Sequence, residues 1–197
     1  MKMFSSASGP QRDETAGTLG DMLRPAGPWL FGKIPAHGDF ISRGLEPKAH
    51  EALDLWLSAE LARARARFTD FDTRYVHAAP WHFVDCDPQG QWSGGALCPS
   101  VDAVGRRFPI LVAAPVADAG QATAVAYAAL DLIFGALGEG WDAPRLHQAL
   151  GEIVPAAGSG PEPTQSVWAI EADDGTRIEM TGRFPDGLVE RMLELAS

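Results

Sequence analysis

The chain has 197 residues, of which 46% are hydrophobic and 21% are charged, so it is long enough for one well-packed domain and too apolar for global disorder. Its 16 basic and 26 acidic residues give a formal net charge of −10. This balance disfavours binding to nucleic acid or to an anionic membrane surface, because both need a basic face.

The first 26 residues are rich in Ser, Gly, Ala, Pro and charge and have no sustained apolar period. We expect a flexible leader over 1–26, followed by a single domain over 27–197. The leader lacks the apolar core of a secretory signal. No run reaches the roughly 18 apolar residues of a membrane span, because the strongest one, 108–117, contains two prolines. We therefore expect a cytoplasmic protein with no direct membrane insertion.

The domain begins with an apolar run of strand length at 28–34. The segment 35–44, which contains one proline and two glycines, is predicted to be a structured loop. The clearest helix spans 46–68, where apolar residues recur at steps of three and four, with Trp56 and Leu57 at the centre of the stripe. We expect this helix to pack on the core.

Two short strands at 80–86 and 91–97 flank a Pro/Gly turn and predict a hairpin. Cys86 and Cys98 would then lie several rungs apart, too far for a disulfide. A strand at 108–116 is apolar on both faces and is predicted to be fully buried.

The second half of the chain alternates helices and strands. A helix at 120–137 is apolar nearly all round, so we expect it to be buried. The remaining predicted elements are a helix at 141–153, a flexible connector at 155–165, a hairpin formed by 166–171 and 176–181, and a helix at 186–195. Strands, hairpins and helices in this order favour an α/β fold with a mixed sheet covered by helices.

Several apparent motifs do not support a cofactor or a metal. The segment 27–33 has the spacing of a phosphate-binding loop, but its interior is bulky and apolar, and Ile34 stands where such loops carry a hydroxyl. His82 and Cys86 would lie about 13 Å apart on one strand, which is too far to share an ion. No serine has glycines two residues away on both sides, so the nucleophile elbow of hydrolases is absent. We predict no metal and no cofactor.

Two charged segments, 32–43 and 99–109, are unusual for a pure scaffold. Each contains an acid and a base that are able either to cap turns and pair with each other or to bind a partner. The candidate residues are Lys33, His37, Asp39, Phe40, Arg43, Asp102, Arg106 and Arg107. Because loops at strand ends commonly meet in α/β sheets, we expect the two segments to lie together, with Asp39 or Asp102 paired to an arginine of the other segment.

The same two segments carry a family resemblance. The sequence GKIPAHGDFISRGL at 32–45 resembles the first signature of the type VI secretion-associated TagF proteins, and PSVDAVGRRFPI at 99–110 resembles their second. Trp29, Trp81 and Phe83 also fit the pattern, whereas Ala169 replaces the second Trp of a Ser-x-Trp-Trp element at 166–169.

The resemblance implies a three-layer α/β/α sandwich and a regulatory protein that is not an enzyme. It implies a post-translational repressor of type VI secretion in Gram-negative bacteria, associated with the cytosolic forkhead-associated scaffold protein of that system. No catalytic residue carries over from the family pattern. The alternative from the residues themselves is an enzyme of unknown reaction that uses His37, Asp39 and Asp102 as an acid/base group, which requires these side chains to converge in a pocket.

Overall fold

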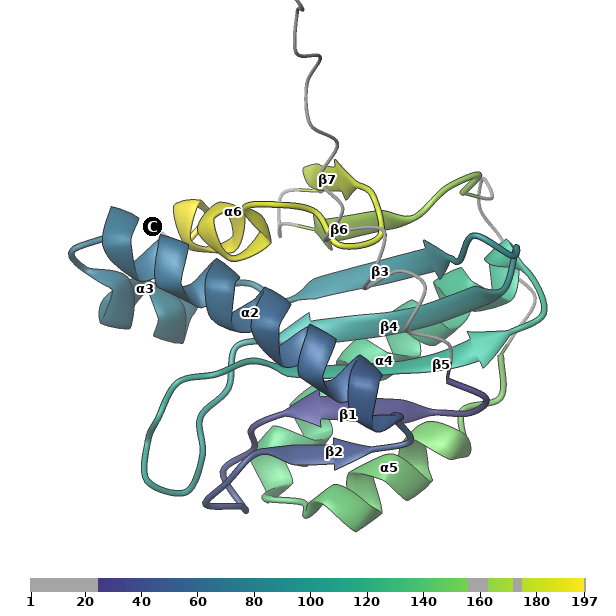
Figure 1. Ribbon diagram of the computed structural model, residues 1–197, viewed down its shortest axis with the longest axis horizontal. Coiled ribbons are helices and arrows are strands. Elements are labelled where there is room, and N and C mark those ends of the chain that lie inside the picture. Colours follow the sequence, from purple (N-terminus) through teal and green to yellow (C-terminus); the bar gives the residue numbers. More distant parts are fainter. Residues whose placement is uncertain (1–24, 156–162, 172–174, 197) are drawn as a thin grey trace, which may run out of the picture.

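The computed structural model describes residues 25–155, 163–171 and 175–196. The leader predicted over 1–26 falls outside the described residues except for Pro25 and Ala26, and so does most of the connector predicted at 155–165. Figure 1 shows the described elements as one central sheet with helices packed against it.

The described strands form one seven-stranded sheet in the order β2-β1-β5-β4-β3-β6-β7. The strands are β1 (Trp29–Gly32), β2 (Ile41–Arg43), β3 (Trp81–Cys86), β4 (Trp92–Cys98), β5 (Ile110–Val116), β6 (Val167–Glu171) and β7 (Arg177–Thr181). Every neighbouring pair is antiparallel, so the expectation of a mixed sheet was wrong. The two predicted hairpins are present as β3–β4 and β6–β7.

The segment predicted as the loop 35–44 contains strand β2. Its three residues pair with β1, with Ile41 opposite Gly32 and Arg43 opposite Leu30. The prediction missed this strand because it is short and lies at the edge of the sheet, where no apolar alternation is required.

One face of the sheet is covered by α2 (Pro47–Arg67), α3 (Phe71–His77) and α6 (Leu188–Glu194). In Figure 1, α2 crosses in front of the strands, and α3 and α6 lie beside its left end. The sequence analysis did not predict α3. Leu57 of α2 is fully buried, as expected, whereas Trp56 is only partly buried and packs against Trp168 and Phe184 at ring-centroid distances of 5.9 and 5.2 Å.

The opposite face is covered by α4 (Ala119–Glu139) and α5 (Ala143–Gly151). Asp118 and Asp142 cap these helices, accepting hydrogen bonds from the backbone N–H groups of Gln121 and Arg145 at 2.8 and 2.9 Å. The connection between them turns at Gly140, whose φ of 66° is in the left-handed region that favours glycine.

Helix α4 is buried on one side only, so the expectation of a buried helix holds for the side that faces the sheet. Phe134 is 52% exposed and Tyr127 is 39% exposed. Among the described helices, α4 alone has the length and apolar composition to cross a membrane, with a mean hydropathy of 1.3 over an 18-residue window, a feature that the search for apolar runs in the sequence did not find. Its inner side packs on the sheet, as in the core helix of a globular domain.

The two cysteines lie at opposite ends of the β3–β4 hairpin, where Cys86 pairs with Trp92 and Cys98 with Ile110 of the next strand. Both are free thiols, as predicted. Burial raises the pKa of the Cys98 thiol to about 12, so this side chain behaves as a small apolar core residue.

Candidate functional site

The two signature segments lie together because β1 ends where β5 begins. Gly32 is opposite Ile110 in this antiparallel pair, so the loops that leave the two strands start at the same point. The Lys33 N–H donates to the Pro109 carbonyl at 3.4 Å, and the Ala103 N–H donates to the His37 carbonyl at 2.9 Å. This juxtaposition confirms the expectation that 32–43 and 99–109 meet.

The close approach of the two signature segments requires glycine at position 32. Its φ is 137°, and a Cβ added there would lie 2.0 Å from the Pro109 carbonyl oxygen. A larger residue at this position would push the first loop away from the second. The signature glycine therefore sets the distance between the two segments.

Asp102 holds the centre of the cluster. Its Oδ1 accepts the backbone N–H groups of Val104 and Arg106 at 3.1 and 2.9 Å, which closes the tight turn of the second loop. Its Oδ2 accepts from Lys33 Nζ at 2.8 Å and from Arg106 Nε at 2.6 Å. The side chains of Lys33 and Asp102 are both buried. Burial by itself would raise the pKa of Asp102, but the hydrogen bonds from Lys33 and Arg106 hold it well below its ordinary value, so the carboxylate stays ionised.

Arg106 links this buried pair to the surface. Its guanidinium donates to the Gly38 carbonyl and lies 3.5 Å from Asp39, so an arginine of the second segment is paired with the aspartate of the first, as expected. The Asp39 side chain is 97% exposed and that of Arg106 is 57% exposed. The outer pair is therefore open to solvent while the inner pair is closed.

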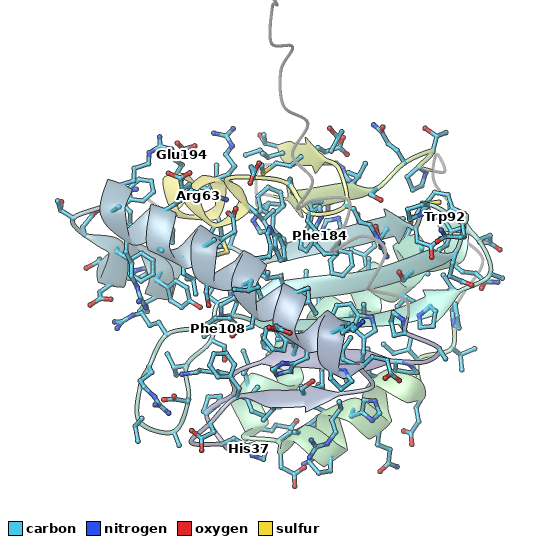
Figure 2. All side chains as sticks on the ribbon, in the orientation of Figure 1. His37, Arg63, Trp92, Phe108, Phe184 and Glu194 are labelled. Carbon is cyan, nitrogen blue, oxygen red and sulfur yellow. The ribbon has the colours of Figure 1, made fainter. Side chains whose placement is uncertain are left out.

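His37 has a structural partner on another element. Its Nε2 accepts the backbone N–H of Ala143 at 3.1 Å, in the first turn of α5. This bond satisfies one of the N–H groups that every helix leaves open at its start. It also ties the first loop to the second helical face, because α5 packs behind the sheet. Figure 2 labels His37 at the edge of the molecule, below Phe108.

Phe40 forms the apolar part of the cluster. Its ring lies 4.6 Å from that of Phe108 and 5.9 Å from that of Phe31, and Lys33 Nζ lies 4.8 Å from its centroid. Phe40 is nevertheless 45% exposed, and Val104 on the second loop is 72% exposed. The outer surface of the cluster therefore combines apolar side chains with an exposed acid–base pair.

Two candidates do not join this cluster. Arg43 lies at the end of β2, is exposed, and donates to the carbonyl of its neighbour Ser42 at 2.8 Å. Arg107 turns toward α3 and pairs with Asp72 at 3.1 Å. Lys33, His37, Asp39, Phe40, Asp102 and Arg106 are brought together, whereas Arg43 and Arg107 point to other parts of the molecule.

The acid/base arrangement of the alternative hypothesis is not seen among the described residues. No contact joins His37 to Asp39 or to Asp102, and the Asp102 carboxylate is closed off by Lys33 and Arg106. No group of three metal-ligating side chains is present in the described part of the chain. A small cavity of about 20 Å³ lies elsewhere, between aromatic residues of the sheet and Arg183, with room for about one water molecule.

The sequence analysis missed a second buried polar network. Asp85 on β3 accepts from Arg183 Nε at 2.7 Å and from the Ser166 hydroxyl at 2.8 Å. Ser166 in turn accepts the backbone N–H of Cys86 at 3.0 Å. The sequence hint of this network was Ser166, the first residue of the Ser-x-Trp-Trp element. Nothing in that element indicates that Ser166 would bind Asp85, which lies 81 residues earlier in the chain.

A comparison with protein-family models matches residues 29–153 to the TagF N-terminal domain, described as type VI secretion system-associated. The match covers more than half of the chain and includes both signature segments. The chain belongs to the TagF family. It is therefore a type VI secretion-associated protein, and the cluster around Asp102 is built from the signature residues of its TagF domain.

Among solved structures, the fold is similar to that of PA0076 from Pseudomonas aeruginosa PAO1, a crystal structure at 2.05 Å resolution. The TM-score is 0.66 at 21% sequence identity, covering 84% of this chain and 93% of that one. A search of curated proteins found no match. The structural likeness covers a larger share of the chain than the TagF match at 29–153. After residue 153, β6, β7 and α6 complete the sheet and the helical layer on the α2 face.

Proposed function

We propose that this TagF protein represses type VI secretion by binding the forkhead-associated scaffold protein of that system in the cytosol, without catalysis. The binding surface is the outer side of the two signature segments. The proposal includes the three-layer α/β/α arrangement that the family resemblance implies, which two apolar clusters on opposite faces of the sheet support.

The observation that carries this proposal is the division of the signature cluster into a closed inner pair and an open outer surface. Lys33 and Asp102 fix the two loops from inside, so the exposed groups on them are held in place before a partner arrives. Such pre-organisation lowers the entropy lost on binding. The exposed groups, Asp39, Phe40, Val104 and Arg106, provide apolar and charged contacts of the kind that anchor protein interfaces.

Repression would follow from mass action. A TagF domain that binds the scaffold removes it from the pool that assembles the apparatus, and the effect depends on the two concentrations and on the dissociation constant. No substrate, metal or cofactor takes part in this mechanism.

The decisive experiment compares two exposed valines. Val104→Asp places a charge on the second signature loop, where the side chain is 72% exposed, and Val76→Asp places the same charge on α3, where it is 67% exposed. Both proteins should remain folded, because neither side chain is buried. Val104→Asp should weaken binding to the purified scaffold at least tenfold and derepress secretion, and Val76→Asp should do neither. Equal scaffold binding by both variants would remove the signature loops from the mechanism.

Arginine variants extend the test. Arg106→Ala and Arg43→Ala should each derepress secretion if both arginines contact the scaffold. Arg106 also supports Asp102, so its variant must be checked for stability, whereas the hydrogen bond that Arg43 makes within the described part of the chain goes to the backbone carbonyl of Ser42. Derepression by Arg43→Ala at an unchanged melting temperature would extend the binding surface to β2.

A further inference from the structure

Helix α4 leaves one narrow stripe exposed among the described residues, whereas Leu130, Leu132 and Leu137 beside it pack against the core. Of its most apolar 18-residue window, 39% is buried and most of the remainder is half-buried, so the exposed part is limited to this stripe. Phe134 is 52% exposed and its ring contacts no other aromatic ring among the described residues. Tyr127, two turns earlier, is 39% exposed; one part of its ring lies against His82 at a centroid distance of 4.7 Å, and its hydroxyl is held by Glu171 at 2.5 Å.

A single carboxylate lies between these two rings. Asp131 is four residues after Tyr127 and three before Phe134, so the three side chains share one stripe of the helix. Asp131 is exposed and has no ion pair or hydrogen bond to any described residue. A surface that covered the stripe would have to supply a cation opposite this carboxylate, because burying an unpaired charge is costly.

Two glycines beside this stripe have no explanation inside the chain. A Cβ added at Gly135 or at Gly138 would meet no atom within 4 Å. Glycine inside a helix is destabilising relative to alanine. Nothing in the described structure approaches these positions, so they leave room for the backbone of another element.

We propose that the outer face of α4 binds an amphipathic helix of a partner protein that carries a lysine or arginine opposite Asp131. Its apolar residues pack on Tyr127 and Phe134, and its backbone approaches at Gly135 and Gly138. This surface lies on the helical face behind the sheet and does not include the exposed groups of the signature loops, so it is independent of the proposed scaffold contact.

The charge of the stripe selects this occupant over two others. A second copy packed antiparallel about the middle of the stripe, at Asp131, would bring this carboxylate against its own symmetry mate, and like charges repel. A membrane surface would have to bury the carboxylate, and an anionic membrane would repel a chain with a net charge of −10. A basic amphipathic helix satisfies both the apolar rings and the carboxylate.

The test uses the full-length chain in its native cell with the photo-crosslinker benzoylphenylalanine in place of Phe134. The same label in place of Leu55, which is 67% exposed on α2, is the matched control. Only the label at 134 should form an adduct with another protein, and mass spectrometry should map it to a segment with apolar residues at helical spacing and a lysine or arginine. Adducts with a second copy of the chain, with lipid alone, or with no molecule would overturn the proposal, as would an acidic or non-helical segment.

Binding is then measured with a synthetic peptide of the mapped segment. Asp131→Lys should weaken binding at least tenfold, and replacing the mapped basic residue by glutamate should restore it. The double variant Gly135→Ala with Gly138→Ala should raise the melting temperature, because both positions have space for a Cβ. It should nevertheless weaken binding of the peptide. Unchanged affinity in either variant would contradict the proposal. Val104→Asp should leave peptide binding intact, which separates this result from the test of the signature loops.

Discussion

Lys33 and Asp102, which are 69 positions apart in the chain, form a buried ion pair with 2.8 Å between Nζ and Oδ2. The pair connects the end of β1 to the loop that leads into β5. It explains why both signature segments contain charges although their centre is closed to solvent, and it separates the residues that hold the loops from those that are free to meet a partner.

The first prediction concerns this pair. Asp102→Asn should lower stability strongly, because the Lys33 ammonium group would remain buried without a counterion. Asp39→Asn should leave stability nearly unchanged, because that side chain is 97% exposed and its pairing with Arg106 is screened by water. Urea unfolding of the two variants provides the comparison, and equal losses would show that the inner pair has no special role.

A pH dependence follows from His82. Burial, and then the nearby Arg177 guanidinium, lower the pKa of His82 to about 4, although Glu171 and Glu179 act in the opposite direction. The unfolded chain binds the proton near pH 6.5, so between about pH 6.5 and 4 the unfolded state takes up a proton that the folded state does not. Stability is therefore fully present above pH 6.5 and falls by about 3 kcal/mol as the pH approaches 4.

The measurement is urea unfolding at pH 7.5 and pH 4.5. Wild-type protein should lose more stability between these values than His82→Phe, which keeps a ring next to Tyr127, 4.7 Å from the His82 ring. His77→Gln is the matched control, because His77 is exposed at the end of α3. Parallel losses in wild type and His82→Phe would mean that His82 is not the group responsible.

The third prediction concerns Glu60. This carboxylate on α2 is fully buried and accepts the backbone N–H groups of Gly187 and Val189 at 3.1 Å each, at the start of α6, and it also pairs with Arg63. Figure 2 labels Arg63 between the two helices. Glu60→Ala should cost about 3 kcal/mol, because it leaves two buried N–H groups without an acceptor. Hydrogen exchange should show the loss of protection first in α6, and uniform loss across the sheet would contradict a local role.

The fourth prediction tests the aromatic layer between α2 and the β6–β7 hairpin. Trp56→Ala should destabilise the protein by about 3 kcal/mol, because it removes ring contacts with Trp168 and Phe184. Leu55→Ala, one position earlier and 67% exposed, should change stability by less than about 0.5 kcal/mol. Chemical denaturation separates the two, and a similar small change in both would mean that Trp56 packs on nothing substantial.

The sequence determined the local elements of this protein. Apolar residues at steps of three and four predicted α2, and a long run that is apolar nearly all round predicted α4. Short apolar segments on either side of a turn predicted the two hairpins. These patterns arise from interactions within a few residues. The strand β2 and the helix α3 were missed because a three-residue edge strand and a seven-residue helix are too short to show a period.

Only the tertiary structure decided which elements meet and what their polar groups bind. Periodicity shows that a side chain faces inward but not which partner it finds there. Asp102 pairs with Lys33, and Glu60 and His37 accept backbone N–H groups from the first turns of α6 and α5. Each of these contacts joins residues that are far apart in the chain. The same limit explains α4. Its composition predicted a buried helix, but the sheet covers only one side of a helix, and the described part of the chain leaves a stripe on the other side exposed.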